Sequence, residues 1–254
     1  MPNTNRPRIS VILPTYNERE NISELMGELS FYISKYIGDD FELLVVDDDS
    51  PDKTWQEAER YSEIDHRIRL IHRTGQRSLA LAISEGIREA KGGIIAWMDC
   101  DFSMPTYRLV ELIKKVFEGY DVAVGSRFVK GGKDVRGPAD SWSIVILSRL
   151  MNSFISFVLG ASFKDYTSGF VAVRRTIFDN GIKINGNYGE YFIDFIYNSR
   201  KRGYKIIELP YYCLPRRRGY SKTGSNLWDY LRIGWVYVLF TLKLRLNLNK
   251  WSPP

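Results

Sequence analysis

The chain has 254 residues, of which 44% are hydrophobic and 26% charged, so it can form one α/β domain with a full core and is neither disordered nor fibrous. Its net charge of +6 is uneven: residues 200–254 hold 12 lysines and arginines against two acids, a balance of +10, which leaves residues 1–199 at −4. A basic C-terminal quarter indicates an anionic partner such as phosphate, nucleic acid or anionic lipid, unless it is only a solvated basic face.

The first 130 residues alternate apolar runs with helix-like segments. We predict strands at residues 9–13, 43–46, 68–71, 94–98 and 122–124, with one helix after Asn21 and another over residues 78–91. Continuous apolar strands separated by helices are typical of a mostly parallel sheet covered on both faces. The predicted fold class is α/β, with a Rossmann-like sheet flanked by helices.

Polar clusters follow three of these strands, at residues 16–18, 47–49 and 99–101. Ligands of open parallel sheets bind at the carboxyl ends of the strands, so we expect the three clusters to converge on one crevice. No Gly-x-Gly-x-x-Gly motif follows a strand and there is no P-loop, which removes the main support for a dinucleotide oxidoreductase or a P-loop ATPase.

Asp99 and Asp101 are separated by one residue at a strand end, where both carboxylates can reach one hard cation and a diphosphate. Mg²⁺ and Mn²⁺ prefer oxygen ligands, and substrate phosphates often complete their coordination. Such a cation stabilises charge on a departing nucleoside diphosphate. Acidic pairs are also common in loops and N-caps, so it is the position after an apolar strand and before Pro105 that favours a metal site.

Acids also follow the second strand, between Asp47 and Asp52. They could cap the helix that begins near Thr54, but three consecutive acids exceed what a cap requires. We predict that Asp48 accepts hydrogen bonds from a ribose or base, and leave Asp47 and Asp49 open.

Two basic features are candidate phosphate sites. Arg127 follows the fifth strand and either binds phosphate or pairs with an acid. Residues 216–222 form a basic, glycine-containing run before an apolar C-terminal helix. Arginine suits bidentate phosphate contact and lysine adds a point charge, so this run could hold a lipid-borne phosphate. The alternative is a solvated loop.

Two apolar stretches, at 141–159 and 227–246, are interrupted by charged or polar side chains. Neither contains a charge-free run that approaches the roughly 20 residues needed to span a bilayer. We expect amphipathic helices lying in a membrane interface, with buried core helices as the alternative. Residues 1–8 are polar and unlike a signal peptide, and the two cysteines are far apart. We therefore expect a cytoplasmic protein, peripherally associated with the cytoplasmic face of a membrane.

With these residues in place, the chain resembles family 2 glycosyltransferases, in particular their dolichyl-phosphate (polyprenyl-phosphate) mannosyltransferase branch. The resemblance covers about residues 8–230 and rests on segments 11–18, 45–52, 99–101, 124–127, 165–170 and 218–222, in the family's order. It implies a GT-A fold over residues 1–230, including an interfacial helix at 141–159, with a C-terminal interfacial helix at 227–246. It also implies inverting transfer of a hexose, first of all mannose from GDP-mannose, to a polyprenyl or dolichyl phosphate.

The resemblance also implies roles for individual residues. The implied catalytic residues are Asp99, Asp101 and Arg127. The implied ligands of Mg²⁺ or Mn²⁺ are Asp99, Asp101 and Ser103. The implied nucleotide contacts are Pro14, Tyr16, Glu18, Val46, Asp48, Asp99 and Cys100, and the implied acceptor-phosphate contacts are Arg218, Ser221 and Lys222. The implied partners are a nucleotide sugar, a polyprenyl phosphate and a membrane surface, without nucleic acid, and a separate membrane subunit is left open.

Three positions depart from the family pattern: Ser103 replaces a usual glutamine, Ser78 precedes Leu79 where Gly-Leu is usual, and residues 187–191 are unlike the expected segment. The last two lie where donor-sugar or acceptor contacts vary, so a UDP-sugar such as UDP-glucose is an alternative donor. A soluble glycan acceptor is a second alternative. A catalytically inactive nucleotide-sugar-binding protein is a third, and Ser103 is its main support.

Overall fold

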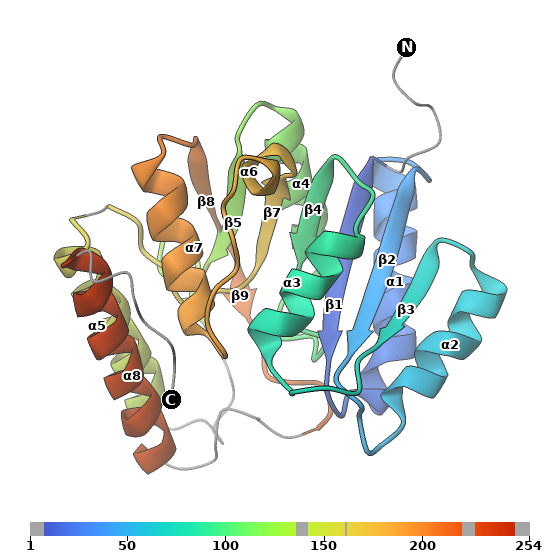
Figure 1. Ribbon diagram of the computed structural model, residues 1–254, viewed down its shortest axis with the longest axis horizontal. Coiled ribbons are helices and arrows are strands. Elements are labelled where there is room, and N and C mark those ends of the chain that lie inside the picture. The colour runs from blue at the N-terminus through green and yellow to red at the C-terminus, as the bar shows by residue number, and fades with distance from the viewer. Residues whose placement is uncertain (1–7, 136–141, 161, 220–226, 247–254) are drawn as a thin grey trace.

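The computed structural model describes residues 8–135, 142–160, 162–219 and 227–246. A seven-stranded sheet with the order β3-β2-β1-β4-β7-β5-β8 forms its centre (Figure 1). Neighbouring strands are parallel except where β7 pairs with β4 and with β5. The mostly parallel α/β sheet is therefore confirmed. The strands are β1 (Ile9–Thr15), β2 (Phe41–Asp47), β3 (Ile68–His72), β4 (Ile94–Trp97), β5 (Val122–Ser126), β7 (Val171–Arg174) and β8 (Ile206–Pro210), and a smaller sheet pairs β6 (Lys133–Asp134) with β9 (Tyr212–Cys213).

Helices cover both faces of the main sheet (Figure 1). One face packs against α1 and α4, and the other against α3 and α7. The helices are α1 (Arg19–Tyr36), α2 (Thr54–Ile64), α3 (Leu79–Glu89), α4 (Thr106–Phe117), α5 (Trp142–Val158), α6 (Thr176–Asp179), α7 (Glu190–Lys201) and α8 (Leu227–Arg245).

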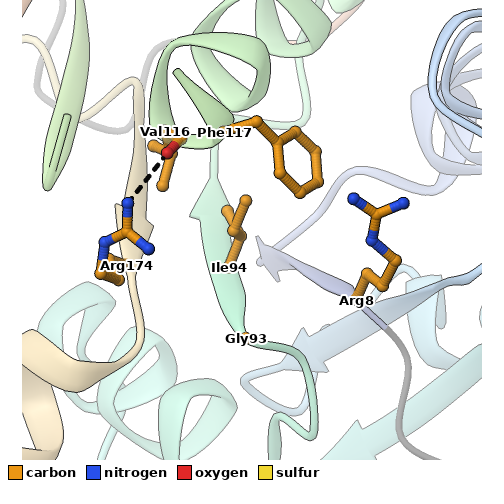
Figure 2. Close-up of a pocket in the computed structure, with 6 residues that line it drawn as sticks. All are labelled: Arg8, Gly93, Ile94, Val116, Phe117 and Arg174. Carbon is orange, nitrogen blue, oxygen red and sulfur yellow. Dashed lines mark hydrogen bonds between the residues drawn. The ribbon is translucent and has the colours of Figure 1, made fainter. Parts of the chain in front are cut away.

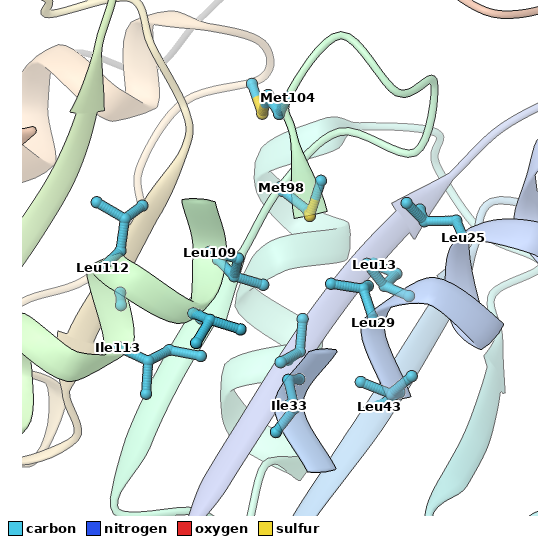
Figure 3. Close-up of a cluster of buried hydrophobic side chains, with 14 of the residues drawn as sticks. Leu13, Leu25, Leu29, Ile33, Leu43, Met98, Met104, Leu109, Leu112 and Ile113 are labelled. Carbon is cyan, nitrogen blue, oxygen red and sulfur yellow. The ribbon is translucent and has the colours of Figure 1, made fainter. Parts of the chain in front are cut away.

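Side-chain alternation along β1 builds both layers of the core. Leu13 packs with α1 and α4 on one face, while Ile12 packs on the other face with α3. On α1, Leu25 and Leu29 belong to the apolar stripe of helical spacing that Figure 3 shows against the sheet. On the opposite face α3 lies very close to β1, because a Cβ on Gly86 would be 2.5 Å from the side chain of Ile12. Because α3 follows the carboxyl end of β3, the helix starts at the carboxyl edge of the sheet.

The antiparallel strand β7 was not predicted. It spans Val171–Arg174, beyond the first 130 residues in which apolar runs alternate with helix-like segments, so no regular local pattern marked it as a strand. Because β7 is inserted between β4 and β5, the segment that precedes it, residues 165–170, enters the sheet at the carboxyl ends of β4 and β5. Part of the polar edge is therefore supplied by a strand that runs in the opposite direction.

The two apolar stretches of the second half form helices. The stretch 141–159 corresponds to α5, with residue 141 outside the described residues, and 227–246 corresponds to α8. These helices pack against each other, and α8 also packs against α7, on one side of the molecule (Figure 1). No helix in the described ranges is long and apolar enough to span a membrane.

Candidate active site

The three polar strand ends lie side by side. β1 pairs in parallel with β2 on one side and with β4 on the other, so residues 16–18, 47–49 and 99–101 leave the sheet at neighbouring positions. The predicted convergence of these clusters at one edge is confirmed.

The backbone turns sharply at the same three strand ends. Left-handed backbone is unusual for a bulky residue and is often found at ligand sites. Phe102 has φ +63° between Asp101 and Ser103, so this turn sets the direction of both side chains. Among the described residues, the non-glycine positions with positive φ are Asn17, Asp49, Lys53 and Phe102, and all except Lys53 lie within a few residues of the ends of β1, β2 and β4.

Asp101 is 1% exposed and has both carboxylate oxygens engaged. Oδ1 accepts a hydrogen bond of 2.9 Å from the backbone N–H of Ser103. Oδ2 lies 2.7 Å from Nη1 of Arg216, and the same nitrogen lies 3.9 Å from Oε1 of Glu18. Arg216 therefore bridges the acids that follow β4 and β1.

Arg216 is a site residue that the sequence reasoning missed. It belongs to the basic run that was identified, but the resemblance pointed to Arg218 instead. Arg218 is exposed, and its Nη1 donates a hydrogen bond of 2.6 Å to the backbone carbonyl of Glu20 at the start of α1. The predicted acceptor contacts Ser221 and Lys222 lie outside the described residues.

The segment that carries these arginines is tied to the end of β4 by its backbone. The N–H of Leu214 donates to the carbonyl of Ser103 at 2.9 Å, and the N–H of Arg217 donates to the carbonyl of Asp101 at 3.1 Å. The guanidinium of Arg217 lies 3.8 Å from the ring centroid of Phe102. The basic segment thus lies directly over the Asp99–Asp101 strand end, as an anion-binding role requires.

The donor atoms at this strand end fit a hard cation whose remaining ligands come from elsewhere. Asp99, Asp101 and Ser103 provide two carboxylates and one hydroxyl, and Asp99 is half-buried. The described part of the chain contains no cluster of three or more His, Cys, Asp or Glu that could hold a metal by itself. Mg²⁺ is commonly bound by one or two carboxylates together with substrate phosphates. This set therefore suits a cation that binds with a diphosphate, and the three ligands stay a prediction.

Asp48 is 9% exposed and follows the last residue of β2. Its Oδ2 accepts a 2.9 Å hydrogen bond from the backbone N–H of Ser78, and its other oxygen pairs with Arg73. Burial raises the pKa of Asp48, against the lowering effects of Ser78 and Arg73. Sequence reasoning missed Arg73, although it directly follows β3, another strand end at the same edge.

The other acids of this run have structural partners. Asp47 is fully buried and accepts from the hydroxyl of Thr15 at 2.8 Å and from the N–H and hydroxyl of Ser50 at 2.9 and 2.6 Å. Asp49 contacts His72 at 2.9 Å. The capping role belongs to Asp52, which accepts from the N–H of Thr54 at 3.0 Å.

The remaining nucleotide-binding predictions fall into two groups. Tyr16 and Pro14 are half-buried at the edge, and the guanidinium of Arg77 lies 4.2 Å from the ring centroid of Tyr16. Val46 and Cys100 are 0% and 2% exposed, so neither residue is accessible to a nucleotide in this structure, and both contacts stay predictions.

Arg127 is 7% exposed and forms an ion pair with Asp165. Its Nε and Nη2 donate to the two carboxylate oxygens at 2.8 and 2.6 Å, its N–H donates at 2.9 Å, and Nη2 also donates to Thr167 at 2.8 Å. This is the pairing with an acid that the sequence left open. It joins the end of β5 to segment 165–170, and a phosphate contact of Arg127 stays a prediction.

A pocket of about 280 Å³ lies at the opposite edge of the sheet (Figure 2). There the guanidinium of Arg174 donates to the carbonyl of Val116 at 3.1 Å. Because the pocket borders the first residue of β4 and the last of β7, it is distant from the carboxyl edge that carries the acids. Its lining residues are Arg8, Gly93, Ile94, Val116, Phe117 and Arg174.

The model of glycosyl transferase family 2 matches residues 10–182, more than half of the chain. The chain belongs to glycosyl transferase family 2. This match begins in β1 and includes the Asp48, Asp99–Asp101 and Arg127 strand ends.

Two curated relatives of the family are similar to the chain over most of its length. The dolichol-phosphate mannosyltransferase of Pyrococcus furiosus is 34% identical over 230 residues, which cover 89% of this chain and 62% of that protein. The polyprenol monophosphomannose synthase of Mycolicibacterium smegmatis is 34% identical over 236 residues, which cover 89% of this chain and 86% of that protein. The chain thus spans less than two thirds of the first relative.

Two solved structures share the fold. A mannosyltransferase from Pyrobaculum calidifontis, in complex with GDP-Man and Mn²⁺, matches 99% of this chain and 67% of its own with a TM-score of 0.59 and 22% identity. A glucosyl-3-phosphoglycerate synthase from Mycobacterium tuberculosis was solved in complex with Mn²⁺, UDP and phosphoglyceric acid. It matches 95% of this chain and 78% of its own chain, with a TM-score of 0.68 and 17% identity. The GT-A fold that the family resemblance implied is thereby confirmed.

Proposed function

We propose that the protein transfers a hexose, with GDP-mannose as the first candidate donor, to a polyprenyl phosphate at a membrane surface. The observation that carries this proposal is the basic segment at Arg216, which lies 2.7 Å from Asp101 at an edge where Asp48 and Asp99 also converge. The acidic side chains proposed to bind a metal and a nucleoside therefore lie beside basic side chains that could bind phosphates. The names of the two curated relatives support mannose and a polyprenyl phosphate.

In this proposal the donor lies across the three strand ends. Asp48 would accept hydrogen bonds from the nucleoside, while Asp99, Asp101 and Ser103 would hold Mg²⁺ or Mn²⁺ together with the diphosphate. The bound cation supplies charge stabilisation for the departing nucleoside diphosphate. Arg216 pairs with Asp101, so its guanidinium lies beside the residues proposed to bind the cation and the diphosphate.

The acceptor phosphate is the nucleophile. Its second pKa is near 6, so it is largely dianionic at neutral pH and needs no strong general base. One of its oxygens forms a bond to the anomeric carbon as the bond from that carbon to the diphosphate oxygen breaks, with inversion. The enzyme's contribution is then positioning and electrostatic stabilisation.

The proposal is tested by incubating the protein with Mn²⁺ or Mg²⁺, dolichyl or undecaprenyl phosphate, and a panel of labelled GDP- and UDP-sugars. We expect organic-extractable label from GDP-mannose. Label from a UDP-sugar instead would reassign the donor. Binding of nucleotide sugars without a lipid product from any donor would contradict the transferase proposal and favour an inactive binding protein.

The exposed apolar faces of α5 and α8 support the membrane surface. On α5, Ile146, Leu150 and Phe157 are 56%, 61% and 85% exposed, at spacings that place them on one side of the helix. On α8, Trp235 and Leu239 are 63% and 42% exposed and lie one helical turn apart. The two helices pack against each other on the side of the molecule distant from β3 (Figure 1), so these exposed apolar side chains belong to neighbouring helices, as an interfacial role requires.

We expect the protein to float with anionic liposomes at low salt, and Phe157→Glu to weaken this association about tenfold, because an inserted aromatic ring contributes roughly 1.5–3 kcal/mol. Phe31→Glu is the matched control, since Phe31 is 58% exposed but lies on α1. If Phe157→Glu and Phe31→Glu weakened liposome association equally, or if the unmodified protein did not float with liposomes, an interfacial role for these helices would be contradicted.

A further inference from the structure

Two departures from the family pattern, Ser78 and the segment 187–191, meet in the structure. Ser78 is 5% exposed at the N-cap of α3. Its hydroxyl donates to the backbone carbonyl of Asn187 at 2.9 Å, while its backbone N–H donates to Oδ2 of Asp48 at 2.9 Å. One residue therefore contacts both the proposed nucleoside carboxylate and the turn that precedes α7.

The turn itself is held from two further sides. Glu190 is 4% exposed, and its carboxylate accepts from the N–H of Asn187 at 2.8 Å and from the N–H of Tyr188 at 3.2 Å. From α8, Tyr237 closes against Gly189, where a Cβ would lie 2.1 Å from the tyrosine hydroxyl. The hydroxyl of Ser78 thus joins a well-defined turn to the start of α3.

The turn leads directly to the diphosphate end of the proposed donor site. Tyr191 follows it, and the hydroxyl of Tyr191 accepts a 3.0 Å hydrogen bond from Nε1 of Trp97. Trp97 is the last residue of β4, two positions before Asp99. Burial, and then the nearby charge of Asp99, raises the pKa of Tyr191, which is consistent with Tyr191 lying close to that carboxylate.

We propose that Ser78 is a positioning residue that couples the nucleoside end of the donor site to its sugar end. This inference rests on the proposed function. In this inference residues 187–190 border the hexose, because they lead into Tyr191, which contacts Trp97 two positions before Asp99. The hydroxyl of Ser78 would then set the position of this turn without contacting the donor. With glycine at this position the N–H that binds Asp48 would be retained but the link to the turn would be lost, so the coupling depends on serine.

Ser78→Ala separates the two functions of this residue, because alanine keeps the N–H and removes the hydroxyl. By calorimetry with Mg²⁺, we expect the affinity for GDP to stay within about twofold of the unmodified protein. Alanine removes the hydrogen bond to Asn187 and the 3.3 Å N-cap hydrogen bond that the hydroxyl accepts from the N–H of Leu81. We expect the affinity for GDP-mannose to fall about fivefold to tenfold, mainly from the loss of the bond to Asn187. Ser78→Thr retains the hydroxyl and should restore GDP-mannose affinity to within about twofold.

Ser62→Ala is the matched control, because the hydroxyl of Ser62 donates to the carbonyl of Glu59 within its own helix at 2.6 Å. Equal losses of GDP and GDP-mannose affinity in Ser78→Ala, or no loss of either, would overturn the coupling, as would failure of Ser78→Thr to restore binding. An unmodified protein that binds both ligands but forms no lipid product overturns the proposed function only. One that binds neither ligand overturns both.

Discussion

Asp101→Asn should abolish metal-dependent turnover, with a loss of at least about 100-fold. A bound divalent cation contributes several kcal/mol to stabilising a departing diphosphate, and each 1.4 kcal/mol corresponds to tenfold in rate. Asparagine keeps the size of the side chain and one acceptor oxygen for the N–H of Ser103. Turnover should be measured with Mn²⁺ and Mg²⁺, and Mn²⁺ binding in the presence of GDP by electron paramagnetic resonance.

Asp49→Asn is the control for this experiment. Asp49 ends the neighbouring acidic cluster, but its side chain is 61% exposed and contacts His72. We expect this variant to keep turnover and Mn²⁺ binding close to those of the unmodified protein. Unchanged turnover of Asp101→Asn would remove Asp101 from the catalytic centre, and unchanged Mn²⁺ binding would remove it from the metal site.

Asp165→Asn should destabilise the protein by about 3–5 kcal/mol, because it leaves the buried guanidinium of Arg127 without its main counter-charge. Asp165 is 0% exposed, and a second acid, Asp134, lies 3.7 Å from Nη1 of Arg127. Burial opposes the charged form of Arg127, but Asp165 outweighs it and holds the pKa of Arg127 well above its ordinary value. Thermal unfolding should show a melting temperature lower by about 10 °C.

Asp39→Asn removes the acid from an exposed ion pair of similar length. Asp39 lies 2.7 Å from Arg67, but its side chain is 76% exposed, so the loss should stay within about 1 kcal/mol. If the two substitutions lowered the melting temperature equally, burial would not be what makes the Arg127–Asp165 pair important. In that case the view that the pair organises segment 165–170 would have to be abandoned.

Local patterns predicted most of the central sheet. The five apolar runs in the first half correspond to β1 to β5, and the three polar clusters lie on adjacent parallel strands, as their positions after the runs indicated. These features are predictable because side-chain periodicity and a polar strand end are properties of neighbouring residues. Strand β7 was missed because it lies beyond residue 130, where the regular alternation of strands and helices ends, and because its antiparallel pairing depends on β4 and β5.

The partners within the site were less predictable. The sequence placed Asp99 and Asp101 together, because one residue between them at a strand end is enough. It could not decide that Asp101 pairs with Arg216, 115 positions later, and not with Arg218. Likewise it left both roles of Arg127 open, and only the antiparallel insertion of β7 brings Asp165 beside it.

By itself the sequence determined the α/β class, the acidic edge of the sheet and the family resemblance, since each depends on residues close together in the chain. Only the tertiary structure decided which cation meets which acid and that Ser78 meets Asn187, 109 positions away. Hydrogen bonds and ion pairs act over about 3 Å, so they exist only after the backbone has brought distant segments together.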